Sequence, residues 1–358
     1  MISASAPGKL YIAGEYAVVE PGHPAILVAV DQFITVSLER TTDMGTIQST
    51  QYGNLPVTWK RENDRLVLDK RENPFHYILA AIEVTESYVK SFGKELSFYH
   101  LSVDSELDSS NGRKYGLGSS AAVTVATVKG VLRFYGLQNE SNETIFKLAA
   151  LAHLSVKSNG SCGDVAASVF GGWLAFTTFD RKWVLQQQQA LSVREVIELE
   201  WPHLSFKQLT PPAEMRLLIG WTGSPASTSH LVDEVTSKRT QDALAYDEFL
   251  AASSACVQEM IRGFEQGDIK KIQEEIRHNR VLLKKMSQTT GVVIETPALT
   301  HLCKLAEDFN GAAKSSGAGG GDCGIVIFDR KDGVLSLITA WEEQGITNLP
   351  LHVYVKNK

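Results

Sequence analysis

Apolar residues along the chain recur at two spacings, which predict strands in some stretches and helices in others. Alternation in steps of two and short apolar runs predict strands at residues 25–30, 33–38, 45–68, 96–103, 173–179, 215–221, 325–328 and 349–355. Steps of three and four residues predict helices at residues 73–92, 142–153, 165–169, 228–266, 268–287, 296–310 and 334–344. Because strands and helices are interspersed in both halves of the chain, the pattern predicts an α+β fold.

A run of four glutamines at residues 186–189 is the best candidate for a connection between domains. The chain has 358 residues, which is enough for two domains of ordinary size. We therefore expect an N-terminal domain over residues 1–189 and a C-terminal domain over residues 190–358.

The composition is that of a folded soluble protein, with 43% hydrophobic and 21% charged residues. No apolar run approaches the roughly 20 residues that cross a bilayer, and the first residues show no signal-peptide pattern. The four cysteines are far apart and the histidines have no H-x-x-x-H spacing, so the sequence suggests neither a disulfide framework nor a zinc site. We expect a cytoplasmic protein, monomeric or homodimeric, that does not bind a membrane.

The formal net charge of −6 bears on the choice of ligand. No long basic run offsets it, which argues against nucleic acid as a partner. If the ligands are themselves anionic, the protein must place cations close to them. A lysine inside a conspicuous motif is therefore informative in this chain.

A glycine- and serine-rich segment, Gly116-Leu117-Gly118-Ser119-Ser120-Ala121, leads into an Ala- and Val-rich helical run. Glycines let a ligand approach the main chain closely, and a serine can cap the helix or face the ligand. The first amides of a helix lack partners within the helix and attract anions, most often phosphate. The alternative is an ordinary turn ahead of a buried helix, and this segment alone does not decide between the two.

Two distant segments are compatible with the same ligand. Gly8-Lys9 precedes an apolar run, and four glycines fall within residues 317–321, between a predicted helix and a strand. Such a glycine run suits a backbone that passes against nucleotide phosphates, although a flexible loop would have the same composition. The P-loop and Rossmann signatures and the H-R-D and D-F-G motifs of protein kinases are missing.

Taken together, three segments resemble the motifs of the GHMP kinases, a family of small-molecule kinases. They are Pro7-Gly8-Lys9 with Gly14-Glu15, the Gly116–Ala122 loop, and Ser316-Gly317-Ala318-Gly319-Gly320-Gly321-Asp322. The resemblance spans nearly the whole chain. It implies an N-terminal domain like domain 2 of ribosomal protein S5 and a ferredoxin-like C-terminal domain, with the site between them.

Within the family, four features resemble the members that act on phosphorylated mevalonate. These are Tyr16, Lys114, the segment at residues 160–166 and the loop at residues 221–229. The resemblance implies phosphoryl transfer from ATP, with Mg²⁺, to (R)-5-phosphomevalonate in the mevalonate route to isoprenoids. The alternatives are a mevalonate kinase and a catalytically silent sensor of nucleotide and metabolite. Diphosphomevalonate decarboxylase shares the fold, but its acceptor side looks less similar.

The resemblance also assigns roles to residues. It implies that Gly116, Leu117, Gly118, Ser119, Ser120 and Ala121 wrap the ATP phosphates, with Ser119 or Ser120 as a Mg²⁺ ligand. Lys9 and Lys114 are the expected cations between the two phosphates. Asp164 is the expected base, but an acceptor that is already a phosphate needs a base less, so Asp164 could instead bind the mevalonate hydroxyl, hold a lysine or cap a helix. The candidate substrate-binding residues are Tyr16, His23, Ser161, Ser224, Ser227, Ser229, Gly317, Gly319 and Gly320. Glu15 is expected to be a structural partner of an amide or a lysine.

Overall fold

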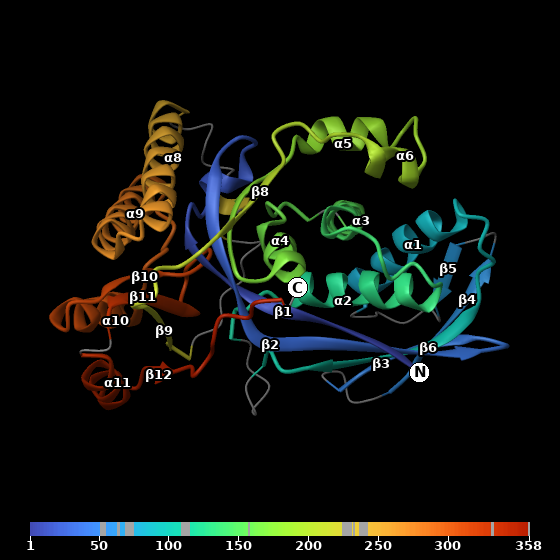
Figure 1. Cartoon of the computed structure of the whole chain (residues 1–358), viewed down its shortest axis with the longest axis horizontal. Helices are drawn as coiled ribbons and strands as arrows, with labels where there is room; N and C mark the ends of the chain where they lie inside the picture. The colour runs from blue at the N-terminus through green and yellow to red at the C-terminus, as the bar shows by residue number, and fades with distance from the viewer. Residues whose placement is uncertain are drawn as a thin grey trace.

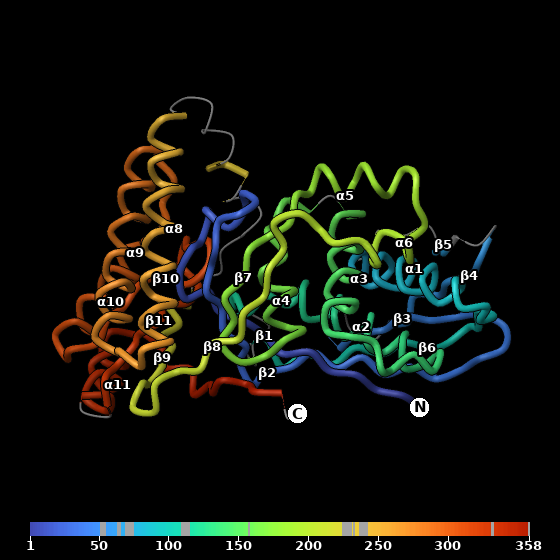
Figure 2. Tube along the Cα trace, turned by 45° about the horizontal axis from the view of Figure 1, so that its top comes forward, coloured from blue at the N-terminus to red at the C-terminus, as the bar shows by residue number. Residues whose placement is uncertain are grey.

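The protein forms two β-sheets that are covered by helices, as the computed structural model shows (Figure 1). The structure describes residues 1–50, 55–62, 65–68, 75–108, 115–156, 158–223, 231, 233–235, 243–330 and 333–356. The first sheet with its helices and the second sheet with its helices lie side by side along the longest axis (Figure 2). The predicted α+β class is confirmed.

The larger sheet has the order β5-β4-β3-β6-β2-β7-β8, and β1 pairs with β2 outside this path. Its strands are β1 (Ile2–Ala13), β2 (Pro24–Thr41), β3 (Gly45–Ser49), β4 (Val57–Glu62), β5 (Arg65–Leu68), β6 (Phe98–Ser105), β7 (Trp173–Thr177) and β8 (Ser205–Leu209). The two strands expected at residues 25–30 and 33–38 are one strand, β2. Its first part pairs with β7 and its second part with β6.

Four helices cover one face of this sheet (Figure 1). They are α1 (His76–Lys90), α2 (Ser119–Phe134), α3 (Asn142–Ser155) and α4 (Gly163–Phe170). Apart from Leu132, the buried side of α2 consists of Ala, Thr, Val and Gly, which lets the helix lie close to the strands; a Cβ on Gly130 would lie 2.7 Å from Leu38. The 3₁₀ helix η1 (Ala17–Val19) and the helices α5 (Arg181–Gln187) and α6 (Val193–Glu198) complete this half.

The smaller sheet is antiparallel throughout, in the order β10-β11-β9-β12. It consists of β9 (Met215–Trp221), β10 (Ala312–Ser315), β11 (Cys323–Asp329) and β12 (Thr347–Asn348), with the helices α8 (Ala243–Gln266), α9 (Ile269–Thr290), α10 (Pro297–Asp308) and α11 (Val334–Glu343). Alternate side chains of β11 enter different cores: Ile325 and Ile327 pack with residues of α8 and α9, and Val326 packs with residues of α10 and α11. Burial on both faces explains why this strand reads as a continuous apolar run.

The glutamine run at residues 186–189 lies at the end of α5 and in the turn after it, and the chain then adds β8 to the larger sheet. The change from the larger to the smaller sheet falls between Leu209 and Met215. The expected boundary between residues 189 and 190 therefore lies inside the part of the chain that builds the larger sheet. A polar run of this kind suits an exposed helix end as well as a linker.

Residues 349–355 do not form the strand that the sequence predicts. β12 ends at Asn348, ahead of Pro350, and the chain then crosses back to the larger sheet (Figure 2). There Tyr354 donates a backbone hydrogen bond to Ala29 (2.9 Å) and accepts one from Gly172 (2.7 Å). We name residues 351–356 the C-terminal return.

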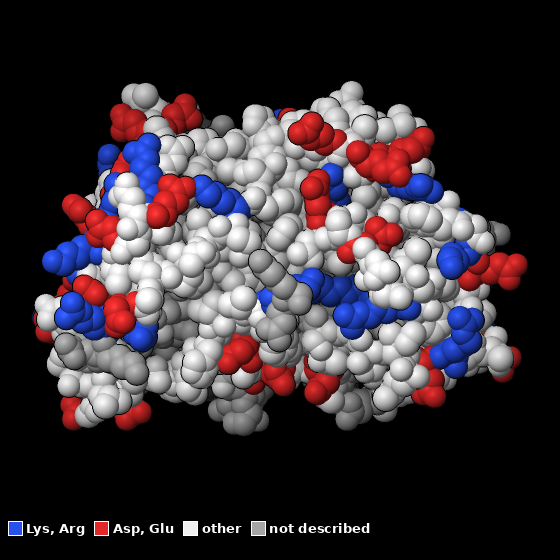
Figure 3. Space-filling view, viewed as in Figure 1, with Lys and Arg blue, Asp and Glu red and all other residues white. Residues whose placement is uncertain are grey.

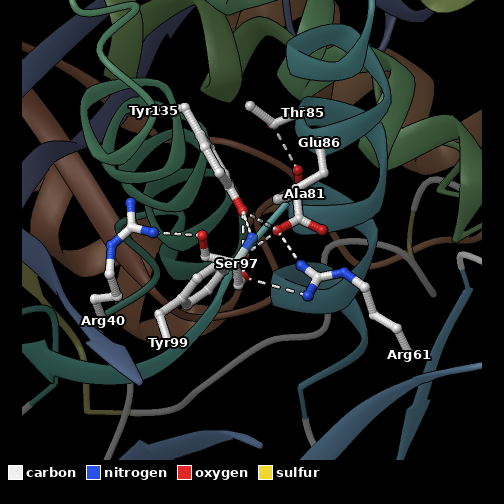
Figure 4. A network of polar contacts seen from close by, with 8 residues as sticks. All are labelled: Arg40, Arg61, Ala81, Thr85, Glu86, Ser97, Tyr99 and Tyr135. Atoms are coloured by element: carbon white, nitrogen blue, oxygen red, sulfur yellow. Dashed lines mark hydrogen bonds and ion pairs between the residues drawn. The ribbon is translucent and has the colours of Figure 1, made fainter. Parts of the chain in front are cut away.

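A buried polar network joins the helices to the larger sheet (Figure 4). The Glu86 carboxylate on α1 accepts hydrogen bonds from Arg61 of β4 (2.5 Å), Tyr99 of β6 (3.0 Å) and Tyr135 after α2 (3.0 Å). Burial raises the pKa of Glu86, although Arg61 and the two hydroxyls act in the opposite direction. The Glu86 carboxylate is removed from water at this position, and the hydrogen bonds of its partners replace its hydration.

Acidic and basic side chains are mixed over the face seen in Figure 3, with a group of basic side chains over α2. Lys129 of α2 is near enough to Arg133 and Lys356 to be repelled by both. Burial and, to a lesser degree, these two cations lower the pKa of Lys129 to about 7. Among the described residues, no helix is long and apolar enough to cross a membrane.

Candidate active site

A pocket of about 340 Å³ lies where the two sheets meet. Its walls come from β1, η1, the starts of α1 and α2, the end of α3, the turn into α4, and the loop between β10 and β11. The three segments that resemble family motifs therefore converge on one cavity, although more than 300 residues of chain separate the first from the last. Of the expected site residues, it is lined by Lys9, Tyr16, Gly116, Gly118, Ser119, Ser120, Ser161, Asp164 and Gly317.

The glycine–serine segment forms the tight turn that the sequence predicts. Gly118 is the N-cap of α2 with φ 80°, and no side chain caps the first turn of the helix. The first amides of α2 are thus open to a ligand, together with the positive end of the helix dipole. Ser119 and Ser120 are the first two residues of the helix, so neither serves as its N-cap.

Both glycines of this turn are required by close contacts as well as by their backbone angles. Gly116 has φ 79°, and a Cβ on it would lie 2.5 Å from the Asp322 carboxylate. A Cβ on Gly118 would lie 2.9 Å from Cε of Lys9. The turn is therefore shaped around two charged side chains.

Among the described residues that line the pocket, Lys9 is the one lysine or arginine. Its side chain is 8% exposed, and Nζ donates a hydrogen bond to the carbonyl oxygen of Gly116 (3.1 Å). Burial lowers the pKa of Lys9, whereas the Asp164 and Asp322 carboxylates raise it. The ammonium group is thus largely shielded from water and interacts with two carboxylates, next to the open amides of α2.

Asp164 lies in the first turn of α4 and accepts a hydrogen bond from the amide of Val165 (3.0 Å). The N-cap of α4 is Cys162, so capping by Asp164, one of the alternatives for this residue, does not occur. Cys162 and Tyr16 both line the pocket with positive φ, of 62° and 63°. Strained non-glycine backbone of this kind is often retained at functional sites.

The oxygen atoms of the pocket suit a hard divalent cation. Ser119 and Ser120 contribute hydroxyls, and Asp164 and Asp322 contribute carboxylates. Mg²⁺ prefers oxygen ligands and keeps several of its waters. The donor set therefore fits Mg²⁺ bound together with nucleotide phosphates.

Several hydrogen bonds join the two halves of the site. The amide of Tyr11 donates to Oγ of Ser316 (3.0 Å), which donates to the carbonyl of Tyr11 (2.8 Å). Within the half that contains the larger sheet, the Tyr11 hydroxyl is paired with Oγ of Ser161 (2.9 Å). The Tyr16 hydroxyl donates to the carbonyl of Ala318 (2.6 Å). The Tyr16 hydroxyl is therefore engaged by the loop between β10 and β11.

Glu15 forms a fully buried ion pair with Lys314 of β10 and accepts a hydrogen bond from the amide of Gly317 (3.3 Å). This confirms the prediction that Glu15 is a structural partner of a lysine or an amide. The pair fixes the end of β1 against the smaller sheet.

Other expected site residues lie elsewhere. His23 does not line the pocket, because its Nδ1 is paired with Oγ of Ser254 on α8 (2.7 Å). Gly319 and Gly320 pack against Ile294, which accepts a hydrogen bond from the amide of Gly320 (2.9 Å). Leu117 and Ala121 are buried beneath the turn. Lys114, Ser224, Ser227 and Ser229 lie outside the described residues.

Asp322, His153 and Tyr77 also line the pocket and were not expected there. Asp322 directly follows the glycine run, so its position in the third motif was a usable signal. His153 is buried on α3, where Nε2 is paired with the hydroxyl of Thr124 (3.2 Å). Burial lowers the pKa of His153, and the Asp164 carboxylate acts in the opposite direction. Only the tertiary packing of α3 against α2 reveals this histidine.

Comparison with known proteins covers both halves of the chain. Residues 76–172 match the GHMP kinases N terminal domain, and residues 260–347 match the GHMP kinases C terminal domain. A phosphomevalonate kinase of a Streptomyces species is 39% identical, over 97% of this chain and 95% of that protein. A mevalonate kinase of Thermococcus gammatolerans is 28% identical, over 92% of this chain and 90% of that protein.

The fold agrees with these matches. The structure of Streptococcus pneumoniae phosphomevalonate kinase in complex with phosphomevalonate and AMPPNP superimposes with a TM-score of 0.86 and 30% identity, covering 99% of this chain and 100% of that one. The similarity thus extends over both sheets and the pocket between them, and the chain belongs to the GHMP kinase family.

Proposed function

We propose that this protein transfers the γ-phosphoryl group of ATP to the phosphate of (R)-5-phosphomevalonate, giving 5-diphosphomevalonate and ADP. The similarity to the Streptomyces and Streptococcus kinases supports this acceptor. The structural observation that carries the proposal is the buried Lys9 ammonium beside the uncapped first turn of α2.

The need for such a cation follows from the charges of the reactants. Two phosphates must approach each other, and their repulsion grows as water leaves the pocket. A fixed positive charge that needs no reorganisation is worth most in that setting. In the proposed complex Lys9 lies between the two phosphates, while the open amides of α2 hold those of the nucleotide. Mg²⁺, when bound, would neutralise nucleotide charge, with the Ser119 or Ser120 hydroxyl as a ligand.

Asp164 has a different task in this proposal. The acceptor phosphate is ionised or nearly so at neutral pH, so the transfer does not require a strong base. Asp164 acts on Lys9 electrostatically and favours its charged form. We infer that Asp164 keeps the ammonium protonated and oriented. Lys114 remains a predicted second cation, and Ser161, Ser224, Ser227, Ser229 and Gly317 remain predicted contacts of the acceptor.

Release of ADP from Mg-ATP, measured separately with mevalonate and with 5-phosphomevalonate, tests the proposal. We expect turnover with phosphomevalonate only, and a loss of at least about 100-fold in kcat in Lys9→Ala. We expect a smaller loss in Asp164→Asn, because an orienting group is weakened but no base is removed. Lys304→Ala, at an exposed position on α10, is the matched control.

Turnover with mevalonate only, abolished in Asp164→Asn, would instead establish a base-dependent mevalonate kinase. The similarity to the Thermococcus enzyme makes this the second candidate. Nucleotide binding without turnover on either acceptor would favour a sensor.

A further inference from the structure

Three side chains with different metal-binding atoms meet between α8 and α9, outside the pocket. They are Cys256 of α8 and Glu275 and His278 of α9, here called the Cys256 cluster. Their sulfur, oxygen and nitrogen atoms all lie within 4.8 Å of one another. In the part of the chain that the structure describes, no other group of three or more His, Cys, Asp or Glu side chains comes together in this way.

The helices place these atoms on facing surfaces. Glu275 and His278 are three residues apart and so lie on one side of α9; Nδ1 of His278 is 3.2 Å from Oε2 of Glu275. Cys256 points at the same turn of α9, with Sγ 3.3 Å from the backbone carbonyl of Glu275. Tetrahedral zinc with bonds of about 2.0–2.3 Å needs ligand atoms roughly 3.4–3.6 Å apart. The three atoms lie within 4.8 Å of one another, so the distances must shorten by at most about 1.4 Å to reach that spacing.

Burial changes across the cluster in the way an accessible metal site requires. Cys256 is 1% exposed, whereas the His278 side chain is 48% exposed. The thiol would therefore be the buried ligand of a metal site, and the imidazole at the surface would give a cation its path of entry.

We propose that the Cys256 cluster is a zinc site that joins α8 to α9. One thiolate, one imidazole and one carboxylate are ligands that zinc accepts, and water would fill the fourth position. Sulfur and nitrogen donors disfavour Mg²⁺ and Ca²⁺, which prefer oxygen. The Cys256 thiol loses its proton to solvent as the sulfur–metal bond forms, because the thiolate is the ligand.

The sequence spacing concealed this site. Cys256 and Glu275 are 19 positions apart and belong to different helices, so no C-x-x-C or H-x-x-x-H pattern arises. None of the three residues lines the pocket. We therefore assign the site to the packing of the helices and expect metal binding without substrate present.

Titration of the chelator-treated, dialysed full-length protein with Co²⁺ tests the proposal, since a thiolate ligand gives a charge-transfer absorption band. We expect a band that saturates at one equivalent and is displaced by Zn²⁺. Cys256→Ala should lack the band, and Cys303→Ala should keep it, because Cys303 is an equally buried cysteine of the same domain outside the cluster. His278→Ala, at an exposed position, should weaken binding at least about tenfold.

Absence of the band in the unaltered protein would refute the site, as would a band that persists in Cys256→Ala. If Cys256→Ala fails to fold, the exposed His278→Ala variant still decides the matter, because unchanged affinity in that variant would contradict the proposed ligand set.

Discussion

Gly116 and Gly118 bring together two requirements that are usually separate, a left-handed backbone and the absence of a side chain. Lys9 and Asp322 occupy the space that a Cβ would need. At these positions even the smallest side chain would move a charged group of the site.

We predict that Gly118→Ala lowers kcat/KM at least about tenfold and destabilises the protein by about 1–3 kcal/mol. Gly136→Ala is the matched control: Gly136 has φ 77°, and a Cβ there would meet nothing within 4 Å. The control should show a similar loss of stability with unchanged kcat/KM, measured by urea unfolding and ADP release. Equal losses of activity in both variants would show that backbone strain, and not displacement of Lys9, is responsible.

Lys9 should also set the alkaline limit of activity. Burial lowers its pKa below the ordinary 10.5, and only the protonated form carries the charge that the phosphates need. We therefore expect kcat/KM, which reports the free enzyme, to fall with rising pH at a midpoint below 10.5. Lys9→Arg should lose this decline in whatever activity it retains, because guanidinium stays charged. The same decline in Lys9→Arg would assign it to another group.

The sequence predicts much of this site because its residues follow one another in short motifs. Lys9, Gly116, Gly118, Ser119 and Asp164 were all expected and all line the pocket. His153 was not, since its place depends on how two helices pack. Gly319 was expected to contact substrate and packs against Ile294, because a glycine run does not reveal which of its members faces a ligand.

Single helices and strands are held in place by polar contacts as well as by their apolar faces. The Glu86 network connects α1 with β4 and β6 (Figure 4). Its residues do not line the pocket, so its effect should be confined to stability.

We predict that Glu86→Ala lowers the free energy of unfolding by about 3–5 kcal/mol, because it removes the acceptor of Arg61 and of two buried hydroxyls. Arg61→Met combined with Glu86→Ala should recover part of this loss, and kcat of the folded protein should not change. The exposed pair Arg194–Glu198 is the control, and Glu198→Ala should have no measurable effect. Urea unfolding measures both.

The raised pKa of Glu86 gives this contribution a definite pH dependence. The folded state holds a proton on Glu86 at pH values where the unfolded state has released it. The contribution of Glu86 to stability therefore decreases as the pH rises from the ordinary pKa of a glutamate through the raised pKa of Glu86. Subtracting the pH profile of Glu86→Gln from that of the unaltered protein should show this decrease, and an increase would contradict it.

Prediction of elements from sequence succeeded where periodicity extends over several turns. The helices α3, α9, α10 and α11 lie close to their expected ranges. The six-residue helix α6 is too short for a periodic signal, and its capping box at Ser192 and Glu195 was the available clue. Residues 349–355 alternate as a strand would, but Pro350 and the contacts with the larger sheet decide their conformation.

At the scale of the whole molecule, the two sheets are bound to each other in several ways. The Glu15–Lys314 pair, the hydrogen bonds of Tyr11 and Tyr16, and the C-terminal return all cross between them. The apolar core is continuous as well, with Phe264 of α8 packed against Trp173 of β7 at a ring distance of 5.3 Å. We therefore expect the protein to unfold in a single transition.

We predict that truncation after Pro350 lowers the melting temperature and separates unfolding into two transitions, because the C-terminal return no longer ties the smaller sheet to β2. Truncation after Lys356 keeps the described contacts of the return and is the control. Differential scanning calorimetry distinguishes the two. A single transition at unchanged temperature after removal of residues 351–358 would show that the other contacts suffice.

The C-terminal return also has a consequence for how the chain is made in the cell. Residues 352–354 leave the ribosome only after the whole of the smaller sheet, yet they provide hydrogen-bond partners for Ala29, Asp31 and Gly172, which were synthesised long before. Until these residues emerge, this part of the larger sheet lacks its final hydrogen-bond partners, although nearly all of its strands have been made. A stalled or prematurely terminated message would therefore yield a protein with its whole pocket encoded but its oldest part left open.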